Sequence, residues 1–351
     1  MEASLRISAA AAHFFAWFSV VFCSIVAKRQ VIRIDTHAHF VPPFYYDLVV
    51  ANGLRSIEWS AADHLQFMDS MNIQLAVLSI STPGARLTPF DVERGRKVAR
   101  QLTEYGQMLT MAYPERFRFL AALALPGVEG SVEEAIYALD TLNAAGVALL
   151  ANSQGEYLGS KKFDPLMEVL NDRHATVFVH PSHLDASPVT TEVRGELLEV
   201  PTYIMDFLLD TTRAAANLVI ANVTGRYPNI KFILAHSGGF IPFAAYRMSV
   251  GMEMFMGANP ERVLAEYKKF YVDTALSSSL SALPSKLQFI PKDQITFGTD
   301  YPYAPTPVIR RFSKAFDEYP LEDKLRRQIN FDSAQRLFEE HLSLWRHLVW
   351  H

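Results

Sequence analysis

Four histidines and one aspartate stand at the ends of short apolar runs of the chain. His37 and His39 follow the first such run after residue 30, and in extended backbone two residues at this spacing point to the same side. His180, His236 and Asp300 each close a later run. Three neutral imidazoles and a carboxylate that leave one coordination position open suit a catalytic Zn²⁺ ion. Mn²⁺, which accepts the same ligand types, is the alternative.

Taken singly, these residues carry little weight. A His-x-His pair arises by chance in many chains, and one histidine after an apolar strand is more often a hydrogen-bonded core residue than a metal ligand. The five residues together, at four strand ends, favour a metal site. Spacing leaves open which of His180 and His236 would contact the metal.

The elements that would position these side chains alternate along the chain from Val31 onward. Eight short runs are typical of buried parallel strands, and amphipathic stretches lie between them. This alternation predicts an α/β fold, a (β/α)₈ TIM barrel, with a doubly wound open sheet as the alternative. In a barrel the carboxyl ends of the strands meet at one face, where barrel enzymes build active sites. The predicted strands are Val31–Asp35, Gln74–Ile80, Phe117–Ala122, Gly146–Leu150, Thr176–His180, Lys231–His236, Phe270–Thr274 and Gln294–Thr299.

The predicted helices fill the intervening stretches. Ser131 and Glu134 have the spacing of a capping box, which predicts that the third helix begins beside them. A last helix, Asp332–Glu340, is expected to close the domain. The other predicted helices include Ala61–Met71, Val92–Tyr113, Val132–Ala145, Asp164–Asp172, Tyr203–Arg226 and Ser279–Phe289.

Four motifs contain the candidate residues: Asp35-Thr36-His37-Ala38-His39, Val179-His180-Pro181, Ala235-His236-Ser237-Gly238-Gly239 and Phe297-Gly298-Thr299-Asp300-Tyr301-Pro302. With these motifs the chain, from Val31 onward, resembles the amidohydrolase superfamily. The likeness is to the branch of aminocarboxymuconate-semialdehyde, γ-resorcylate and 6-methylsalicylate decarboxylases. Binuclear amidohydrolases use a carboxylated lysine at the end of strand four. Here no lysine follows that strand until Lys161, so one metal ion is expected.

The resemblance implies a role for each candidate residue. It makes His236 an acid or base that hydrogen-bonds a metal-bound water or the substrate, a role that suits imidazole because it titrates near neutral pH. It makes Arg247, on the helix after strand six, the group that binds the substrate carboxylate across the interface of a homodimer. A solvated helix arginine is the alternative for Arg247. The implied metal ligands are His37, His39, His180 and Asp300.

Within that branch, the stretches Trp59-Ser60, Phe67-Met68-Asp69, Leu78–Gly84 and Tyr137–Asp140 look most like the 6-methylsalicylate decarboxylase group. The resemblance therefore implies nonoxidative decarboxylation of a salicylate-like aromatic acid. The expected reaction converts 6-methylsalicylate to m-cresol and CO₂, a step of secondary metabolism.

In this reaction the metal would anchor the carboxylate and the neighbouring hydroxyl while Asp300 or His236 protonates the ring carbon. Phe40, Trp59 and Phe297 would offer a flat apolar wall for the ring, although core packing explains these side chains equally well. Hydrolysis of a lactone or amide needs the same ligands and is the alternative reaction. A barrel that binds ligand without catalysis is the third interpretation.

The bulk composition fits one catalytic domain. The chain has 351 residues, of which 50% are hydrophobic, and we expect a single domain over residues 31–351. The formal net charge of −4 gives no basic footprint for nucleic acid. A single cysteine, Cys23, excludes an intrachain disulfide and a thiolate metal cluster.

The N-terminal segment, residues 1–30, differs from the rest. Residues 7–27 contain no charged side chain, and as a helix they would span about 32 Å, roughly a bilayer's hydrocarbon thickness. This predicts a membrane anchor, with a cleaved signal or a dispensable extension as alternatives. Lys28 and Arg29, which follow the segment, favour a cytoplasmic catalytic domain.

Overall fold

The computed structural model describes residues 31–87, 91–182 and 201–342. The apolar stretch 7–27, for which an anchor or signal was predicted, lies outside the described residues. Among the residues that are described, no helix combines the length and the apolar character needed to cross a bilayer.

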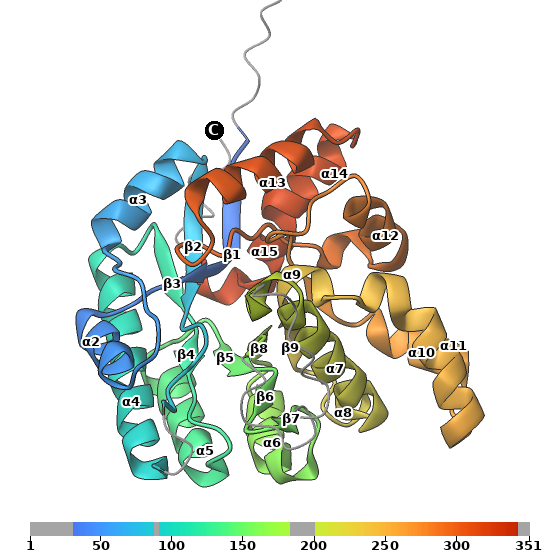
Figure 1. The fold of residues 1–351 in the computed structure, drawn as a ribbon, viewed down its shortest axis with the longest axis horizontal. Coiled ribbons are helices and arrows are strands. Elements are labelled where there is room, and N and C mark those ends of the chain that lie inside the picture. Colours follow the sequence, from blue (N-terminus) through green and yellow to red (C-terminus); the bar gives the residue numbers. More distant parts are fainter. Residues whose placement is uncertain (1–30, 88–90, 183–200, 343–351) are drawn as a thin grey trace, which may run out of the picture.

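Parallel strands form the centre of the molecule (Figure 1). One sheet has the order β1-β2-β3 and a second has the order β10-β9-β8-β5-β4, with every neighbouring pair parallel. A short antiparallel hairpin, β6-β7, stands apart. The strands are β1 (Arg33–His39), β2 (Ile73–Ser79), β3 (Phe117–Phe119), β4 (Ala121–Ala122), β5 (Val147–Leu150), β6 (Asn152–Ser153), β7 (Glu156–Tyr157), β8 (Thr176–His180), β9 (Lys231–Leu234) and β10 (Tyr271–Val272).

The two sheets join at both edges. On one side β3 and β4 are a single run interrupted at Leu120, whose amide still donates to Leu78 of β2 (2.8 Å). On the other side, residues 295–301 lie between β10 and β1. Ile295 bridges to Val272, and Tyr301 bridges to Ala38. The fold is therefore the predicted (β/α)₈ barrel, and the doubly wound open sheet was the wrong alternative.

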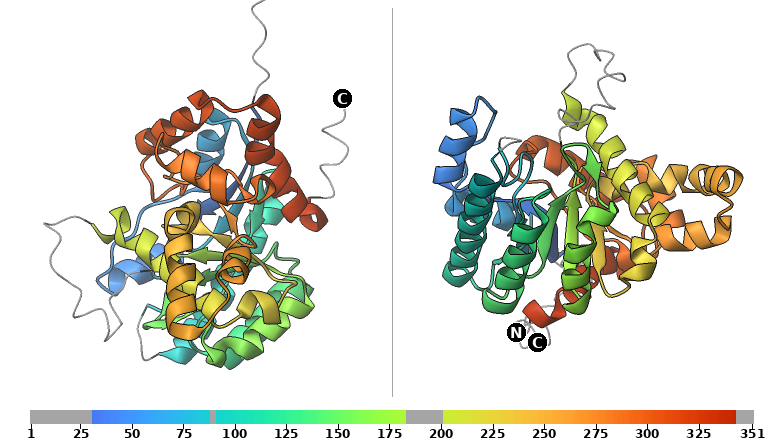
Figure 2. Two further views of the ribbon diagram at one scale, coloured as in Figure 1. Left: turned by 90° about the vertical axis from the view of Figure 1, so that its right-hand side faces the viewer. Right: turned by 90° about the horizontal axis from the view of Figure 1, so that it is seen from below.

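Helices surround the strands in all three views (Figures 1 and 2). In two of the views α10 and α11 project from one side of the molecule. The α-helices are α2 (Pro43–Ala51), α3 (Ala61–Ser70), α4 (Val92–Ala112), α5 (Val128–Ile136), α6 (Asp164–Asp172), α7 (Asp206–Ile220), α8 (Val223–Arg226), α9 (Ala235–Gly238), α10 (Ile241–Met256), α11 (Pro260–Tyr267), α12 (Ala282–Phe289), α13 (Thr306–Glu318), α14 (Asp323–Arg327) and α15 (Ser333–Leu337).

Several predicted boundaries were wrong. The first strand continues through His39, so the His-x-His pair lies inside β1 rather than after it. The segment predicted as the eighth strand pairs only through isolated bridges and single hydrogen bonds. Helix α5 begins at Val128, so Ser131 lies inside the helix and is no cap. Glu134 instead accepts from Arg100 Nε at 2.8 Å.

One end of the barrel is closed by apolar packing. Ile34 of β1, Phe178 of β8 and Ile233 of β9 pack in one buried cluster with Leu337 of α15 and Phe338. The predicted closing helix therefore seals the end at which the strands begin. Polar and charged side chains gather at the opposite end, where the strands finish.

Candidate metal centre

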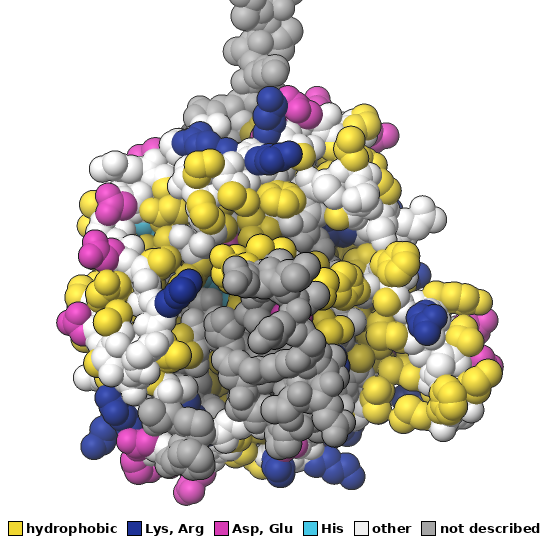
Figure 3. Space-filling model, viewed as in Figure 1, with side chains coloured by type: hydrophobic (Ala, Val, Ile, Leu, Met, Phe, Trp, Pro, Cys, Tyr) yellow, Lys and Arg dark blue, Asp and Glu magenta, His cyan; other side chains and the backbone are white. Residues whose placement is uncertain are grey.

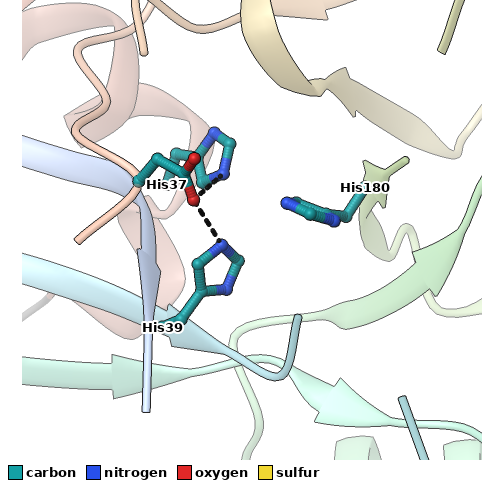
Figure 4. Close-up of side chains that lie close together, drawn as sticks. His37, His39 and His180 are labelled. Carbon is teal, nitrogen blue, oxygen red and sulfur yellow. Dashed lines mark hydrogen bonds and ion pairs between the residues drawn. The ribbon is translucent and has the colours of Figure 1, made fainter. Parts of the chain in front are cut away.

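His37, His39, His180 and Asp300 meet at the carboxyl end of the barrel. One ligand atom from each lies within 4.8 Å of those of the other three, and all four residues are buried. In Figure 4 the three labelled imidazoles, from β1 and β8, approach one common region. Four side chains that are far apart in the sequence thus form a single compact group.

The δ nitrogens of two of these imidazoles have acceptors outside the group. His37 Nδ1 lies 2.7 Å from Asp273 Oδ2, and His180 Nδ1 lies 2.7 Å from the Pro181 carbonyl oxygen. Because a carboxylate and a carbonyl only accept, both δ nitrogens carry the proton. In the neutral imidazoles the ε nitrogens are then lone pairs that a metal could bind. Both are buried, and neither has a hydrogen-bond partner among the described residues.

His39 and Asp300 complete the group. His39 Nδ1 lies 3.0 Å from Ser79 Oγ, and its Nε2 lies 3.1 Å from Asp300 Oδ1. The same oxygen is 3.3 Å from His37 Nε2. Buried polar atoms nearly always have a partner, so two bare imidazole nitrogens beside a buried carboxylate are a set that a divalent cation would satisfy. The residues present fit one metal ion.

The electrostatics of the group also favour a bound cation. Burial lowers the pKa of His39 and takes that of His180 well below its usual value. Burial also lowers the pKa of His37, but the carboxylates of Asp273 and Asp300 outweigh it and raise that pKa to about 10. The site therefore attracts a positive charge, which in the absence of a metal is a proton on His37.

His236 lies at the edge of this group rather than in it. Its Nε2 is 3.9 Å from Asp300 Oδ2, and its Nδ1 is 3.4 Å from the carbonyl oxygen of Ala275. Burial lowers the pKa of His236, so its imidazole is neutral near pH 7. Spacing left open which of His180 and His236 would contact the metal, and the geometry places His180 with the other three ligand atoms.

Two buried carboxylates next to the group were missed as functional residues. Asp273 follows β10 and accepts from His37, and Asp35 accepts from the His37 amide (3.0 Å) and from Thr299 Oγ1 (2.5 Å). Burial raises the pKa of Asp35 to about 7 against the effect of these hydrogen bonds. The sequence could have identified Asp273 as a candidate, since it follows an apolar run in the same way as His180.

The other predicted residues lie apart from the group. Arg247 is exposed on α10, and no acidic side chain of the described residues pairs with it. Phe297 is buried under the Arg33 guanidinium (4.8 Å), and Phe40 stacks on Tyr105 in the core. For these two phenylalanines core packing was the correct interpretation.

Two aromatic rings beside the ligands were not predicted. Tyr303 lies with its ring centroid 5.5 Å from that of His39, and Phe207 lies 6.0 Å from His180. Neither residue belongs to a motif that is recognisable by its spacing from a strand end. Both reach the site from the segments that follow the strands.

Comparison with known proteins agrees with this geometry. A family model described as "Amidohydrolase" matches residues 34–339. The chain is 32% identical over 321 residues to "Decarboxylase yanB" of Aspergillus niger, covering 87% of each chain. It is 30% identical over 317 residues to "6-methylsalicylic acid decarboxylase" of Penicillium expansum, covering 87% of this chain and 96% of that one.

Solved structures share the fold. A crystal structure of an amidohydrolase II superposes with a TM-score of 0.81 at 26% identity, over 88% of this chain and 99% of that one. A dihydroxybenzoic acid decarboxylase from Polaromonas, solved with bound manganese and the inhibitor 2-nitroresorcinol, gives a TM-score of 0.74 at 21% identity. That match covers 91% of this chain and 99% of the other.

Proposed function

This chain belongs to the amidohydrolase family, and we propose that it is a metal-dependent carboxy-lyase that decarboxylates a salicylate-like aromatic acid without an oxidant. The best candidate reaction is 6-methylsalicylate to m-cresol and CO₂, the acid named in the relative from Penicillium expansum. One observation supports a metal above all: the buried ε nitrogens of His37 and His180 lie beside the Asp300 carboxylate without a hydrogen-bond partner among the described residues.

We propose His37, His39, His180 and Asp300 as the metal ligands, with Zn²⁺ as the ion and Mn²⁺ as the alternative. When bound, the cation would hold the substrate's carboxylate and neighbouring hydroxyl and withdraw negative charge from them. Mn²⁺ stays in consideration because the Polaromonas decarboxylase was solved with manganese.

His236 is our candidate for moving the proton. Its Nδ1 proton faces the Ala275 carbonyl, so its Nε2 is a free acceptor on the side of Asp300. We propose that Nε2 takes the proton of the substrate's phenolic hydroxyl and returns it to the ring carbon that bears the carboxylate. The C–C bond electrons then restore the ring as CO₂ leaves, and the phenolate takes a proton from water.

Asp300 is less suited to be the donor. Burial alone would raise the pKa of Asp300, but the positive charge on metal-free His37 and the hydrogen bond from His39 outweigh it and hold that pKa well below its usual value. A carboxylate in that state has no proton to give. We therefore assign Asp300 to binding the metal and to facing His236, whose protonated form it would stabilise.

The test is direct. Purified protein loaded with Zn²⁺ or Mn²⁺ is supplied with 6-methylsalicylate, and m-cresol and CO₂ are measured. Asp300→Asn and His236→Gln should each retain less than about a tenth of the wild-type rate, and His236→Gln should keep its metal. Hydrolysis of lactones or amides without any decarboxylation would favour the alternative reaction.

We also propose that the active form is a homodimer built on α10. This helix exposes Phe243 (86%), Met254 (75%) and Phe255 (84%), and Arg247 stands among them. Figure 3 shows apolar side chains gathered on the projecting side of the molecule. A cluster of large exposed apolar side chains is typical of a contact surface. From such a surface Arg247 would reach the partner's substrate carboxylate.

Light scattering after gel filtration tests the dimer. Phe243→Asp with Phe255→Asp should give a monomer, whereas Arg247→Met should stay dimeric and raise KM more than it lowers kcat. A monomeric wild-type protein with full activity would remove the dimer from the proposal.

We propose one catalytic domain over residues 31–351, held at a cytoplasmic membrane face by residues 7–27. Carbonate extraction of membranes that contain the full chain would test the anchor, since an anchored protein stays with the membrane pellet.

A further inference from the structure

Lys286, on α12, is a buried cation that the proposed reaction does not use. The residue is 1% exposed, and its Nζ lies 2.8 Å from Ser237 Oγ and 3.4 Å from the carbonyl oxygen of Asp273. Burial lowers the pKa of Lys286 to about 8, although the Asp273 carboxylate opposes this shift. A methionine would fill the same space without burying a charge. What sets the lysine apart from such a residue is the ammonium group and the bonds that it makes.

The ammonium supports a strained turn. His236, Ser237, Gly238 and Gly239 all have positive φ angles, of 52°, 63°, 71° and 62°. Left-handed backbone costs free energy in residues that carry a Cβ, and it persists only where the surroundings hold it. Ser237 Oγ donates to the Asp273 carbonyl at 3.3 Å and accepts from Lys286. The side chain at the centre of the turn is thus fixed from two directions.

This turn is what aims His236 at Asp300. If the turn relaxed toward right-handed backbone, the His236 ring would leave its place beside Asp300. The same ammonium also contacts the backbone of Asp273, whose carboxylate accepts from His37. Lys286 therefore contacts both the turn that positions His236 and the residue, Asp273, that orients His37.

We propose that Lys286 is a positioning residue, which acts through Ser237 and the Asp273 carbonyl to hold the turn that directs His236 toward the substrate. The expected loss of kcat rests on the proposed decarboxylation, whereas the effect of Lys286 on the position of His236 does not. Lys286 itself contacts neither the proposed ligands nor the reacting atoms.

The experiment compares Lys286→Met, Ser237→Ala and the double variant with wild type and with Lys292→Met, which replaces an exposed lysine just after α12. In the metal-loaded proteins, kcat should fall at least about tenfold in both single variants with KM nearly unchanged, as misplacement of a catalytic group predicts. Because both residues act through one contact, the double variant should be no slower than the slower single variant. Lys292→Met should match wild type.

A second measurement does not depend on activity. The ring ¹⁵N signals of His236 in histidine-labelled, metal-free protein should shift in Lys286→Met and in Ser237→Ala, and stay in place in Lys292→Met. Ser237→Ala alone decides the matter if Lys286→Met does not fold. Unshifted His236 signals, or losses of kcat that multiply in the double variant, would overturn the proposal. A wild type that shows no decarboxylation but gives the expected shifts would refute the reaction and leave the positioning role standing.

Discussion

His37 is held from both sides by carboxylates, and this arrangement fixes what its ring can do. Asp273 Oδ2 accepts from Nδ1 at 2.7 Å, and Asp300 Oδ1 stands 3.3 Å from Nε2. The first contact sets the tautomer and the ring orientation, which leaves the second nitrogen free for a metal. How well His37 would bind a metal thus depends on Asp273, a residue that would not itself contact the ion.

Asp273→Asn tests this dependence. The amide keeps the shape of the side chain but removes its charge, so we expect metal affinity to fall about 10- to 100-fold. Competition with a chelator of known affinity measures the change. Asp293→Asn, at an exposed aspartate, is the control. Equal affinities in the two variants would show that Asp273 does not tune the site.

Lys286 gives a pH-dependent signature of its own. Its pKa falls from 10.5 to about 8 on burial, so between these values the unfolded chain holds more protons than the folded one. The free energy of unfolding should therefore rise with pH across this window, by at most about 1.4 kcal/mol per pH unit. Urea unfolding of wild type and Lys286→Met should diverge in favour of wild type as pH increases. Parallel curves would contradict the buried-charge assignment.

Side chains at strand ends could be predicted, because a residue at the carboxyl end of a barrel strand lies at that face of the barrel. His180 and Asp300 were found in this way. Lys286 was not, since a lysine on a helix is usually exposed and nothing local marks it as buried. Tyr303 was missed for a similar reason, because its approach to His39 depends on how the chain turns after Asp300.

At the scale of elements, the link between β9 and α10 is under tight steric constraint. A Cβ at Gly239 would lie 2.1 Å from the Leu208 carbonyl oxygen and 2.6 Å from Thr212 Oγ1, and φ there is +62°. The carbonyl belongs to α7, so the turn and that helix are in close contact. Only glycine permits this approach.

Gly239→Ala should accordingly destabilise the fold by about 3 kcal/mol or more, because the added methyl meets backbone that cannot move cheaply. Gly251→Ala, within α10, is the matched control. A Cβ there meets nothing within 4 Å, and alanine should stabilise the helix by about 0.5–1 kcal/mol. Urea unfolding measures both variants. Similar values for the two would mean that the turn is not under steric constraint.

The existence of each strand could be predicted better than the residues at which it begins and ends. Each of the eight predicted runs occupies a place in the barrel, because a strand buried on both faces needs a continuous apolar run. The predicted strand boundaries were wrong where tertiary contacts determine the end of a strand. β1 extends through His39 because β2 pairs with it up to Ser79. The last run pairs only through isolated bridges and single hydrogen bonds, and its backbone leaves the strand direction at Asp300, whose φ is +66°.

At the scale of the whole molecule, a bound metal ion would stabilise the folded barrel. The proposed ligands come from β1, β8 and the last barrel segment, so an ion bound to the folded state alone must stabilise the entire ring of strands. Zn²⁺ or Mn²⁺ at about a hundredfold excess over its Kd should add about 2.7 kcal/mol and raise Tm by about 4 °C. Calorimetry with and without chelator measures this. Asp300→Asn should respond much less, and an equal response would place the ion elsewhere.

The closure of the barrel between its first and last segments also governs when the site can exist during synthesis. His39 and Asp300 touch across 261 positions of sequence. A chain still emerging from the ribosome has made its two N-terminal imidazoles long before the carboxylate that completes the cluster. Until then those imidazoles are half of a chelate, open to whichever cation the cell supplies. The proposed ion could therefore be held by all four side chains only after Asp300 has been made.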